Sequence, residues 1–329
     1  MGIPWNNIVL GECLPLLEGL PGGSIDLIVS SPPYNLGKEY EARRALEVYL
    51  QEQRKVLEEC HRVLKSSGSL FWQVGSFSYK GQLIPLDVRF FPILEELGFF
   101  PRNRIAWVRQ HGVHGKKKFS PRYETLLWFT KGEDYLFDLD PIRVPQKYPQ
   151  KAYHKGPKRG QLSGNPKGKN PGDVWVFRNV KHNHEEQTIH PCQFPEDMVS
   201  RIVLSTTREG DRVFDPYMGS GTVAVVCRDH GRIFLGAEKE ERYHATCLRR
   251  LSGEPDGEGR FPNLKTLRDY VERTGEPIEQ FSFDVQVGSS PSGREQSRIH
   301  SEEQHLQNLF ERLEKEEGAF SDRLGEGSE

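Results

Sequence analysis

Short apolar runs alternate along the chain with longer segments in which apolar residues recur every three or four positions. Runs rich in branched and aromatic residues, bounded by Gly or Pro, predict buried strands at residues 7–13, 25–30, 68–74, 104–108, 124–129, 212–215 and 232–237. Helical spacing predicts helices at 45–64, 85–97 and 195–206, and a helix that starts at 223. Strands alternating with helices predict an α/β fold with a doubly wound, mostly parallel, Rossmann-like sheet covered on both faces.

Two prolines stop the apolar run at 25–30. The loop that follows reads Ser-Pro-Pro-Tyr, and its prolines fix φ and lack an N–H, which makes it rigid and leaves carbonyl groups unpaired. Ligands bind where such loops leave the C-terminal ends of strands in an open α/β sheet. A hydroxyl and a carbonyl can accept both hydrogens of a planar amine while a ring stacks on it, as around a flipped nucleobase. The candidate catalytic residues are Ser31, Pro32, Pro33 and Tyr34.

A second motif follows the strand predicted at 212–215. A turn there contains two glycines that let the backbone approach a ligand closely, and a helix begins after it. The next strand ends in an acidic residue about twenty positions beyond the glycines, which suits ribose hydroxyls. The turn is neither the full dinucleotide fingerprint nor a P-loop, because no Gly-Lys-Ser/Thr follows it. The candidate cofactor-binding residues here are Asp215, Pro216, Gly219, Ser220, Gly221, Thr222 and Glu238.

Together the two motifs make the chain resemble the DNA amino-methyltransferases that use S-adenosyl-L-methionine. Members of that family carry a [D/N/S]-P-P-[Y/F] loop for the target amine and a D-P-F-x-G-S-G-T-like turn for the cofactor. Here the two read Ser-Pro-Pro-Tyr-Asn at 31–35 and Asp-Pro-Tyr-Met-Gly-Ser-Gly-Thr at 215–222. The loop precedes the turn, an order that resembles the permuted β group of restriction–modification enzymes, whereas protein-glutamine methyltransferases carry Asn-Pro-Pro-Tyr and the opposite order. The resemblance covers roughly residues 5–252 and implies a methyltransferase-type sheet.

The resemblance also implies a cofactor and a reaction. It implies that S-adenosyl-L-methionine contacts the glycine turn and Glu12, which stands where the family usually has Gly-Asp beside the adenine. Ser31 and the Pro32 carbonyl would accept the two hydrogens of an exocyclic amine, and Tyr34 would stack on the flipped base. Alignment of nitrogen, methyl and sulfur is then the main task, and no general base is required. In the family Ser in the first position is commoner for cytosine N4 and Asp for adenine N6, so we expect cytosine N4, with adenine N6 as the alternative.

Two other functions are alternatives to methylation of an exocyclic amine. Cytosine C5 methylation needs a nucleophilic Cys after Pro, and Pro191-Cys192 is present. That dipeptide precedes the cofactor turn, however, in a context that resembles the cofactor-contact segment of the amino-methyltransferases. A non-catalytic DNA-binding protein with a methyltransferase shell is the second rival, and the intact loop and glycine turn argue against it.

The net charge of −2 hides an uneven distribution along the 329 residues. Residues 102–189 contain 18 Lys and Arg against 8 Asp and Glu, whereas residues 301–329 contain 3 against 9. Clustered positive charge neutralises phosphates, so the middle of the chain predicts binding of double-stranded DNA. The candidate DNA-binding residues are Lys116, Lys117, Lys118, Lys158, Arg159, Lys167 and Lys169.

These patterns divide the chain into four segments. We expect the catalytic part of the methyltransferase domain at 1–131, a basic target-recognition insert at 132–186, the cofactor-binding part at 187–252, and a linker with an acidic C-terminal extension at 253–329. Within the extension, residues 305–315 have the spacing of one amphipathic helix.

The remaining features bound the cellular setting. The 5 cysteines lack paired spacing, which indicates reduced thiols and no metal site, although His182, His184 and His190 cluster with Cys192. No apolar stretch reaches membrane-spanning length and no signal peptide is visible, so we expect a cytoplasmic protein. A cognate restriction endonuclease is a candidate partner, and the sequence does not predict the oligomeric state.

Overall fold

The computed structural model describes residues 3–37, 41, 43–109, 114–181, 184 and 186–253. Eight strands in this part of the chain form one sheet: β1 (Asn7–Leu10), β2 (Ile25–Ser30), β3 (Leu64–Val74), β6 (Phe100–Val108), β7 (Tyr123–Thr130), β8 (Val174–Val176), β9 (Arg212–Asp215) and β10 (Ile233–Glu238). Two more, β4 (Ser76–Tyr79) and β5 (Gln82–Pro85), form a separate hairpin. The helices are α1 (Cys13–Glu18), α2 (Leu46–Val63), α3 (Leu86–Glu96), α4 (Glu196–Thr206), α5 (Thr222–Asp229) and α6 (Glu241–Ser252), with a 3₁₀ turn at Asp140–Ile142.

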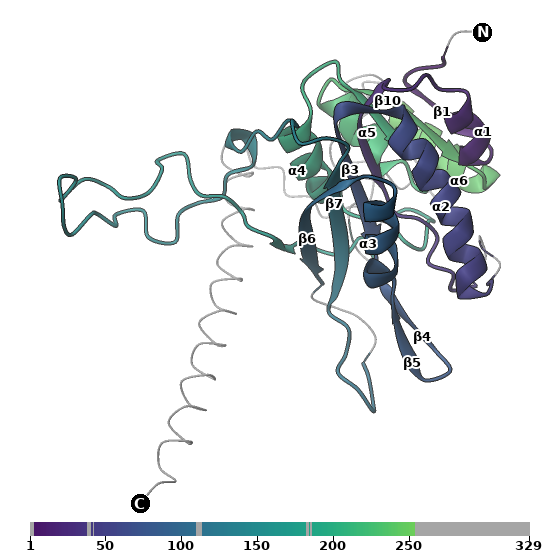
Figure 1. Ribbon diagram of the computed structural model, residues 1–329, viewed down its shortest axis with the longest axis horizontal. Helices are drawn as coiled ribbons and strands as arrows, with labels where there is room; N and C mark the ends of the chain where they lie inside the picture. Colours follow the sequence, from purple (N-terminus) through teal and green to yellow (C-terminus); the bar gives the residue numbers. More distant parts are fainter. Residues whose placement is uncertain are drawn as a thin grey trace, which may run out of the picture. The chain divides into compact units, whose positions relative to one another are not determined.

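The large sheet has the strand order β1-β10-β9-β2-β3-β7-β6-β8 (Figure 1). Neighbouring strands from β1 to β3 are parallel, β7 is antiparallel to both β3 and β6, and β8 is parallel to β6. From β2 the chain continues to β3 on one side of β2, whereas β9 and β10 follow each other on its other side, so the strand order reverses direction there. The sequence prediction of a doubly wound, mostly parallel α/β sheet is confirmed, and its switch point lies between β2 and β9.

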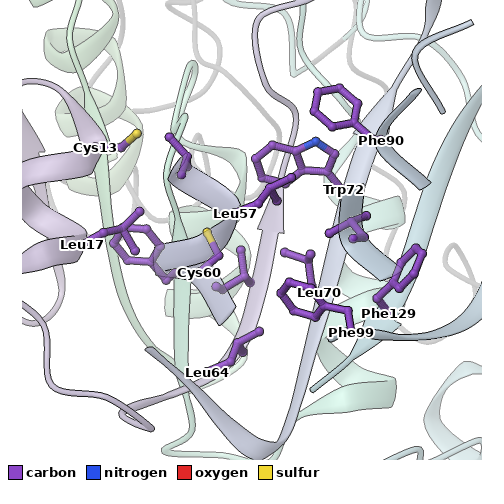
Figure 2. Packing of buried hydrophobic residues seen from close by; sticks show 14 of the residues in the cluster. Cys13, Leu17, Leu57, Cys60, Leu64, Leu70, Trp72, Phe90, Phe99 and Phe129 are labelled. Atoms are coloured by element: carbon purple, nitrogen blue, oxygen red, sulfur yellow. The ribbon is translucent and has the colours of Figure 1, made fainter. Parts of the chain in front are cut away.

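Side chains alternate between the two faces of the sheet and build two apolar cores. Ile28 and Trp72 belong to one core, with residues of α1, α2 and α3, part of which Figure 2 shows. Leu27 and Phe71, one position earlier on the same strands, belong to the other, with residues of α4, α5 and α6. Because successive strand residues point to opposite faces, near-continuous apolar runs are what a sheet covered on both sides requires.

The start of β3 differs from the prediction. The strand predicted at 68–74 begins earlier, at Leu64, directly after α2 ends at Val63, so the Ser-Ser-Gly stretch at 66–68 lies inside the strand. Ile25 of β2 pairs with Leu64 but Leu27 pairs with Ser69, so the extra residues form a bulge. A turn-like composition inside a strand is explained by this bulge, because bulges tolerate residues that regular pairing disfavours.

The predicted insert leaves the sheet after β7 and returns as β8. Ile142 and Trp175 near its two ends are buried, and the guanidinium of Arg201 on α4 lies 5.1 Å from the Trp175 ring centroid. Between these ends, Val144 and Lys169 exchange two backbone hydrogen bonds of 3.0 and 2.7 Å. The residues enclosed by this bridge are mostly exposed and form a long loop that extends away from the sheet (Figure 1).

The predicted linker and acidic extension at 253–329, with its helix at 305–315, lie outside the described residues except for Gly253. Among the helices that the structure describes, none has the length and hydropathy needed to cross a membrane.

Candidate functional site

The two sequence motifs meet at the switch point of the sheet. The Ser-Pro-Pro-Tyr loop follows β2, the glycine turn follows its neighbour β9, and a cavity of about 440 Å³ lies between them. Of the predicted site residues, this cavity is lined by Glu12, Ser31, Pro32, Pro33, Tyr34, Pro216, Gly219, Ser220, Thr222 and Glu238. Asp215 and Gly221 do not line it. The volume falls in the range of small-molecule and cofactor pockets.

Tyr34 is held by residues from the ends of two further strands. Its hydroxyl donates to Gln73 Oε1 at 2.6 Å on β3 and lies 3.2 Å from Glu124 Oε2 on β7. The Glu124 carboxylate is itself fixed by Arg109 at 2.8 Å and by the Gln73 amide. Burial, followed by the Glu124 charge, raises the pKa of Tyr34 well above its usual value, so the hydroxyl stays protonated. The ring is thereby oriented before any ligand arrives.

Gly75 makes room for this ring. A Cβ at position 75 would lie 2.9 Å from Tyr34 Cε2 and 3.5 Å from Glu124 Cδ, so a larger residue would displace the tyrosine. The glycine directly follows β3, and β4 begins at the next residue. This contact has no signal in the sequence, because it depends on the distance between two segments that fold together.

The rest of the loop is also pre-formed. Tyr49 on α2 donates to the Pro33 carbonyl at 2.6 Å, whereas no described residue donates to the Pro32 carbonyl. Asn35 is buried with φ of 58°, in the left-handed region that Asn tolerates, and its side chain exchanges two hydrogen bonds with the backbone of Arg44. The Ser31 hydroxyl and the Pro32 carbonyl are thus acceptors on a rigid loop that faces the cavity.

On the cofactor side, Glu238 shapes the glycine turn. Its Oε2 accepts the Gly219 N–H at 2.8 Å, and its Oε1 accepts the Glu240 N–H at 2.8 Å. Burial raises the pKa of this carboxyl, while the two backbone donors favour its ionised form. Gly219 has φ of 58°, and a Cβ there would lie 3.3 Å from the His190 ring.

Asp215 and Gly221 lie outside the lining of the cavity and contact residues of the turn and its neighbours. Asp215 Oδ1 accepts hydrogen bonds from Ser30 Oγ at 2.6 Å and from the Tyr217 N–H at 3.0 Å. Burial raises the pKa of Asp215 to about 7. Gly221 is the N-cap of α5 with φ of 80°, and a Cβ there would lie 3.1 Å from Cys247. In the structure these two residues contact the backbone and neighbouring side chains of the turn and do not line the cavity.

Arg250, which no sequence motif marks, lies on α6 and is 1% exposed. One nitrogen, Nη1, donates to the Ser220 carbonyl at 2.6 Å and lies 3.2 Å from Thr222 Oγ1, while Nη2 pairs with Glu196 Oε1 at 2.6 Å. The side chain thus ties the glycine turn to the start of α4. The buried residues of α6, at 243, 246, 247 and 250, follow helical spacing. This spacing is hard to recognise in the sequence because the last of these core positions holds a charged residue.

Glu186 lies near Arg250 and Glu196, where the insert rejoins the fold. Its Oε2 accepts the Glu196 N–H at 2.9 Å at the start of α4. Burial and the nearby Glu196 charge raise the pKa of Glu186 above its usual range. A buried carboxyl therefore lies at the junction between the insert and the cofactor turn.

Glu12 occupies the far end of the cavity, after β1. It is the N-cap residue of α1 without a side-chain capping bond, and its side chain is 70% exposed, with Lys239 Nζ at 4.0 Å. A carboxylate in this position is accessible to a ligand in the cavity, which suits the predicted contact.

The predicted DNA-binding residues fall into two groups. Lys116, Lys117 and Lys118 lie on the exposed loop between β6 and β7, at the sheet edge that carries Tyr34. The other four lie on the insert: Lys158, Arg159, Lys167 and Lys169. Lys158 Nζ lies 6.0 Å from the Tyr153 ring centroid, and Lys167 pairs with Asp140.

The histidine and cysteine residues near the cavity do not form a metal cluster in the part of the chain that the structure describes. His182 lies outside that part. Cys192 is exposed, whereas the four other cysteines are buried, and no disulfide joins any of the five.

Comparison with known proteins identifies the family. A family model described as DNA methylase, of the N6/N4 methyltransferases, matches residues 25–249. The chain belongs to this family. This chain is 56% identical over 313 residues to the Type II methyltransferase M.BglII of Bacillus subtilis, covering 94% of this chain and 86% of that protein.

Two further similarities are informative. This chain is 34% identical over 254 residues to the DNA adenine methyltransferase YhdJ of Escherichia coli strain K12, covering 74% of this chain and 82% of that protein. Among solved structures, the cytosine-N4-specific PvuII DNA methyltransferase superposes with a TM-score of 0.59 at 21% identity, covering 73% of this chain and 84% of that one. At that identity the superposition supports the fold alone.

Proposed function

We propose that this DNA methylase transfers a methyl group from S-adenosyl-L-methionine to the exocyclic amine of a flipped base in double-stranded DNA, with cytosine N4 as the target. The observation that carries the proposal is the cavity shared by the Ser-Pro-Pro-Tyr loop and the glycine turn. An amine at the loop and a cofactor at the turn would face each other across it. Base flipping is required because a base inside the duplex cannot reach such a cavity.

The glycine side of the cavity fits the cofactor. Gly219 leaves open the space that a Cβ would fill, and the backbone there can approach a ligand closely. Glu238 lies at the end of β10, where an acidic side chain suits ribose hydroxyls, and Glu12 is accessible at the far end. When bound, S-adenosyl-L-methionine supplies a methyl group already activated by its sulfonium. The chain's task is to hold the acceptor nitrogen in line with it.

The loop side performs that positioning. The Ser31 hydroxyl and the Pro32 carbonyl accept the two N–H hydrogens of the amine, which favours a pyramidal nitrogen and directs its lone pair toward the methyl group. Tyr34 stacks on the base, and its bonds to Gln73 and Glu124 keep the ring in place. Transfer breaks the sulfur–methyl bond, leaves a neutral thioether and gives a positively charged nitrogen, which then releases one N–H proton to water, so the scheme needs no general base.

Ser31 is the reason for preferring cytosine N4, since Ser in the first loop position is commoner among enzymes with that target. Adenine N6 is the second candidate, favoured by the 34% identity to a relative named as a DNA adenine methyltransferase. Mass spectrometry of nucleosides from DNA of an expressing host separates the two. The proposal predicts N4-methylcytosine, at a lower level in a host that expresses the Tyr34→Ala variant. N6-methyladenine would reassign the base, and neither product would overturn the function.

We also propose a role in a type II restriction–modification system, supported by the 56% identity to a Type II methyltransferase. The insert at 132–186 is then the target-recognition segment, the cytoplasm is the place of action, and a restriction endonuclease with the same recognition sequence is the partner enzyme. Mapping methylated positions across host DNA would give one short sequence if this is correct. Methylation scattered without a common sequence would contradict it.

A further inference from the structure

Two segments outside the insert leave the sheet beside the catalytic tyrosine. The hairpin β4–β5 begins directly after Gly75, which packs against Tyr34. The loop between β6 and β7 has its feet at Arg109 and Tyr123, and Arg109 is paired with Glu124, which lies 3.2 Å from the Tyr34 hydroxyl. The hairpin therefore begins next to a residue that packs against Tyr34, and the loop begins at a residue that is linked to Tyr34 through one side chain. Tyr34 is the residue that is proposed to stack on the flipped base.

The hairpin and the loop contact each other beyond the sheet. Lys118 Nζ donates to Ser78 Oγ on β4, and the two segments project from the same edge (Figure 1). The guanidinium of Arg43 lies 4.2 Å from the centroid of the Tyr79 ring on the hairpin. We call the hairpin and the described part of the loop, residues 76–85 and 114–122, the arm.

The composition of the arm differs from that of the whole chain, whose net charge is −2. The hairpin contributes Lys80 and the loop contributes three lysines and Arg122, and neither segment contains Asp or Glu. Such a surface is complementary to phosphates. Phe119, directly after the three lysines, is 100% exposed, and Tyr79 and Tyr123 are 45% and 60% exposed. Three exposed rings on two neighbouring segments, together with basic residues, indicate a binding surface.

We infer that the arm is a second DNA-contact surface, in which Phe119 enters the base stack beside the flipped base while the neighbouring lysines hold phosphates. Proteins that unstack DNA insert apolar side chains between bases in this way and compensate the cost with backbone contacts. The position of the arm next to Tyr34 places this wedge at the base that must leave the duplex. The inference rests on the proposed function and adds the residue that opens the helix.

The test compares methyl transfer to two duplexes that contain the methylated sequence found in host DNA. In one the target base is correctly paired, and in the other it is mispaired, which lowers the cost of extruding it. Phe119→Ala should slow transfer to the paired duplex by about tenfold or more and should slow transfer to the mispaired duplex much less. Phe100→Ala is the matched control, because Phe100 is 41% exposed at the opposite end of β6.

Each outcome has one interpretation. Phe119→Ala rates equal to wild type on both duplexes, or reduced equally on both, would overturn the wedge. A change in oligomeric state of Phe119→Ala with unchanged transfer would assign the arm to protein contacts instead. Wild-type protein that transfers no methyl group to either duplex would overturn the proposed function, and this inference with it. Cofactor affinity by calorimetry should be the same in Phe119→Ala, Phe100→Ala and wild type.

Discussion

The Ser30 hydroxyl donates a 2.6 Å hydrogen bond to Asp215 Oδ1. The two residues end β2 and β9, and both are buried. One precedes the Ser-Pro-Pro-Tyr loop and the other begins the glycine turn, so this bond fixes the distance between the two sides of the cavity. It also places an ionisable group at the centre of the sheet, with consequences for stability.

Asp215→Asn should remove part of the pH dependence of folding. Burial raises the Asp215 pKa from 3.8 to about 7, so between these values the folded protein holds a proton that the unfolded chain releases. The free energy of unfolding therefore falls as pH rises through this window, by on the order of 4 kcal/mol for this group. Asn cannot titrate but still accepts from Ser30.

Urea unfolding of both proteins at pH 5 and pH 8 measures the effect. The wild type should lose more stability than Asp215→Asn between these values. Asp134→Asn, which alters an exposed carboxylate, serves as the control and should behave as wild type. Identical pH dependence in wild type and Asp215→Asn would show that Asp215 is ionised throughout.

Tyr34→Ala should separate base binding from cofactor binding. Loss of stacking costs on the order of 1–3 kcal/mol, which corresponds to a roughly five- to 150-fold slower methyl transfer. Tyr34→Phe keeps the ring but loses the bonds to Gln73 and Glu124, so its rate should lie between those of wild type and Tyr34→Ala. Calorimetry should give nearly the same cofactor affinity for all three proteins. Parallel loss of rate and cofactor affinity would contradict the assignment of the loop to the base.

Gly219→Val should weaken cofactor binding. The new side chain would extend into the cavity and toward the His190 ring, and we expect at least about a tenfold loss of affinity. Gly210→Val is a matched control, because Gly210 also has positive φ but no atom lies within 4 Å of the place its Cβ would take, and it does not line the cavity. Both variants should lose stability from backbone strain, and only Gly219→Val should lose affinity. Unchanged affinity in folded Gly219→Val would remove the turn from the cofactor site.

Replacing Lys158 and Arg159 by Ala should flatten the salt dependence of DNA binding. Each phosphate contact adds about −0.9 to the log–log slope of affinity against salt. If either side chain reads guanine, its loss should also relax sequence choice by about 1–3 kcal/mol per base. Arg208→Ala is the control, because Arg208 is exposed before the start of β9, at the end of the strand opposite to the cavity. A slope unchanged in the double variant would place recognition outside this part of the insert.

Local patterns in the sequence were sufficient to predict the central strands and both loops of the cavity. The apolar run at 25–30 and its prolines predicted β2 and its end correctly, because both are local properties. The sequence patterns did not predict the hairpin β4–β5. Its turn uses positive φ at Lys80 and Gly81, and Lys is not a residue that signals such turns.

The supporting contacts of the site could not be predicted, for a different reason. Gly75 and Arg250 act through residues far away in sequence, Tyr34 in the first case and Ser220 in the second. A motif identifies the residues that face a ligand because their types are constrained by its chemistry. The residues behind them are constrained by geometry, which only the folded chain defines.

The strand order β1-β10-β9-β2 also has a consequence for how the protein is made. The first two strands do not touch each other; the gap between them is filled by β9 and β10, which are among the last elements of the described chain. When only the residues up to α4 have been synthesised, β1 has no neighbouring strand and β2 is paired on one side only. The sheet can therefore be completed only after residues 212–238 have been synthesised. Because these pairings join strands that are far apart in sequence, they predict slow folding. During translation, the catalytic loop exists before the strands that complete its pocket.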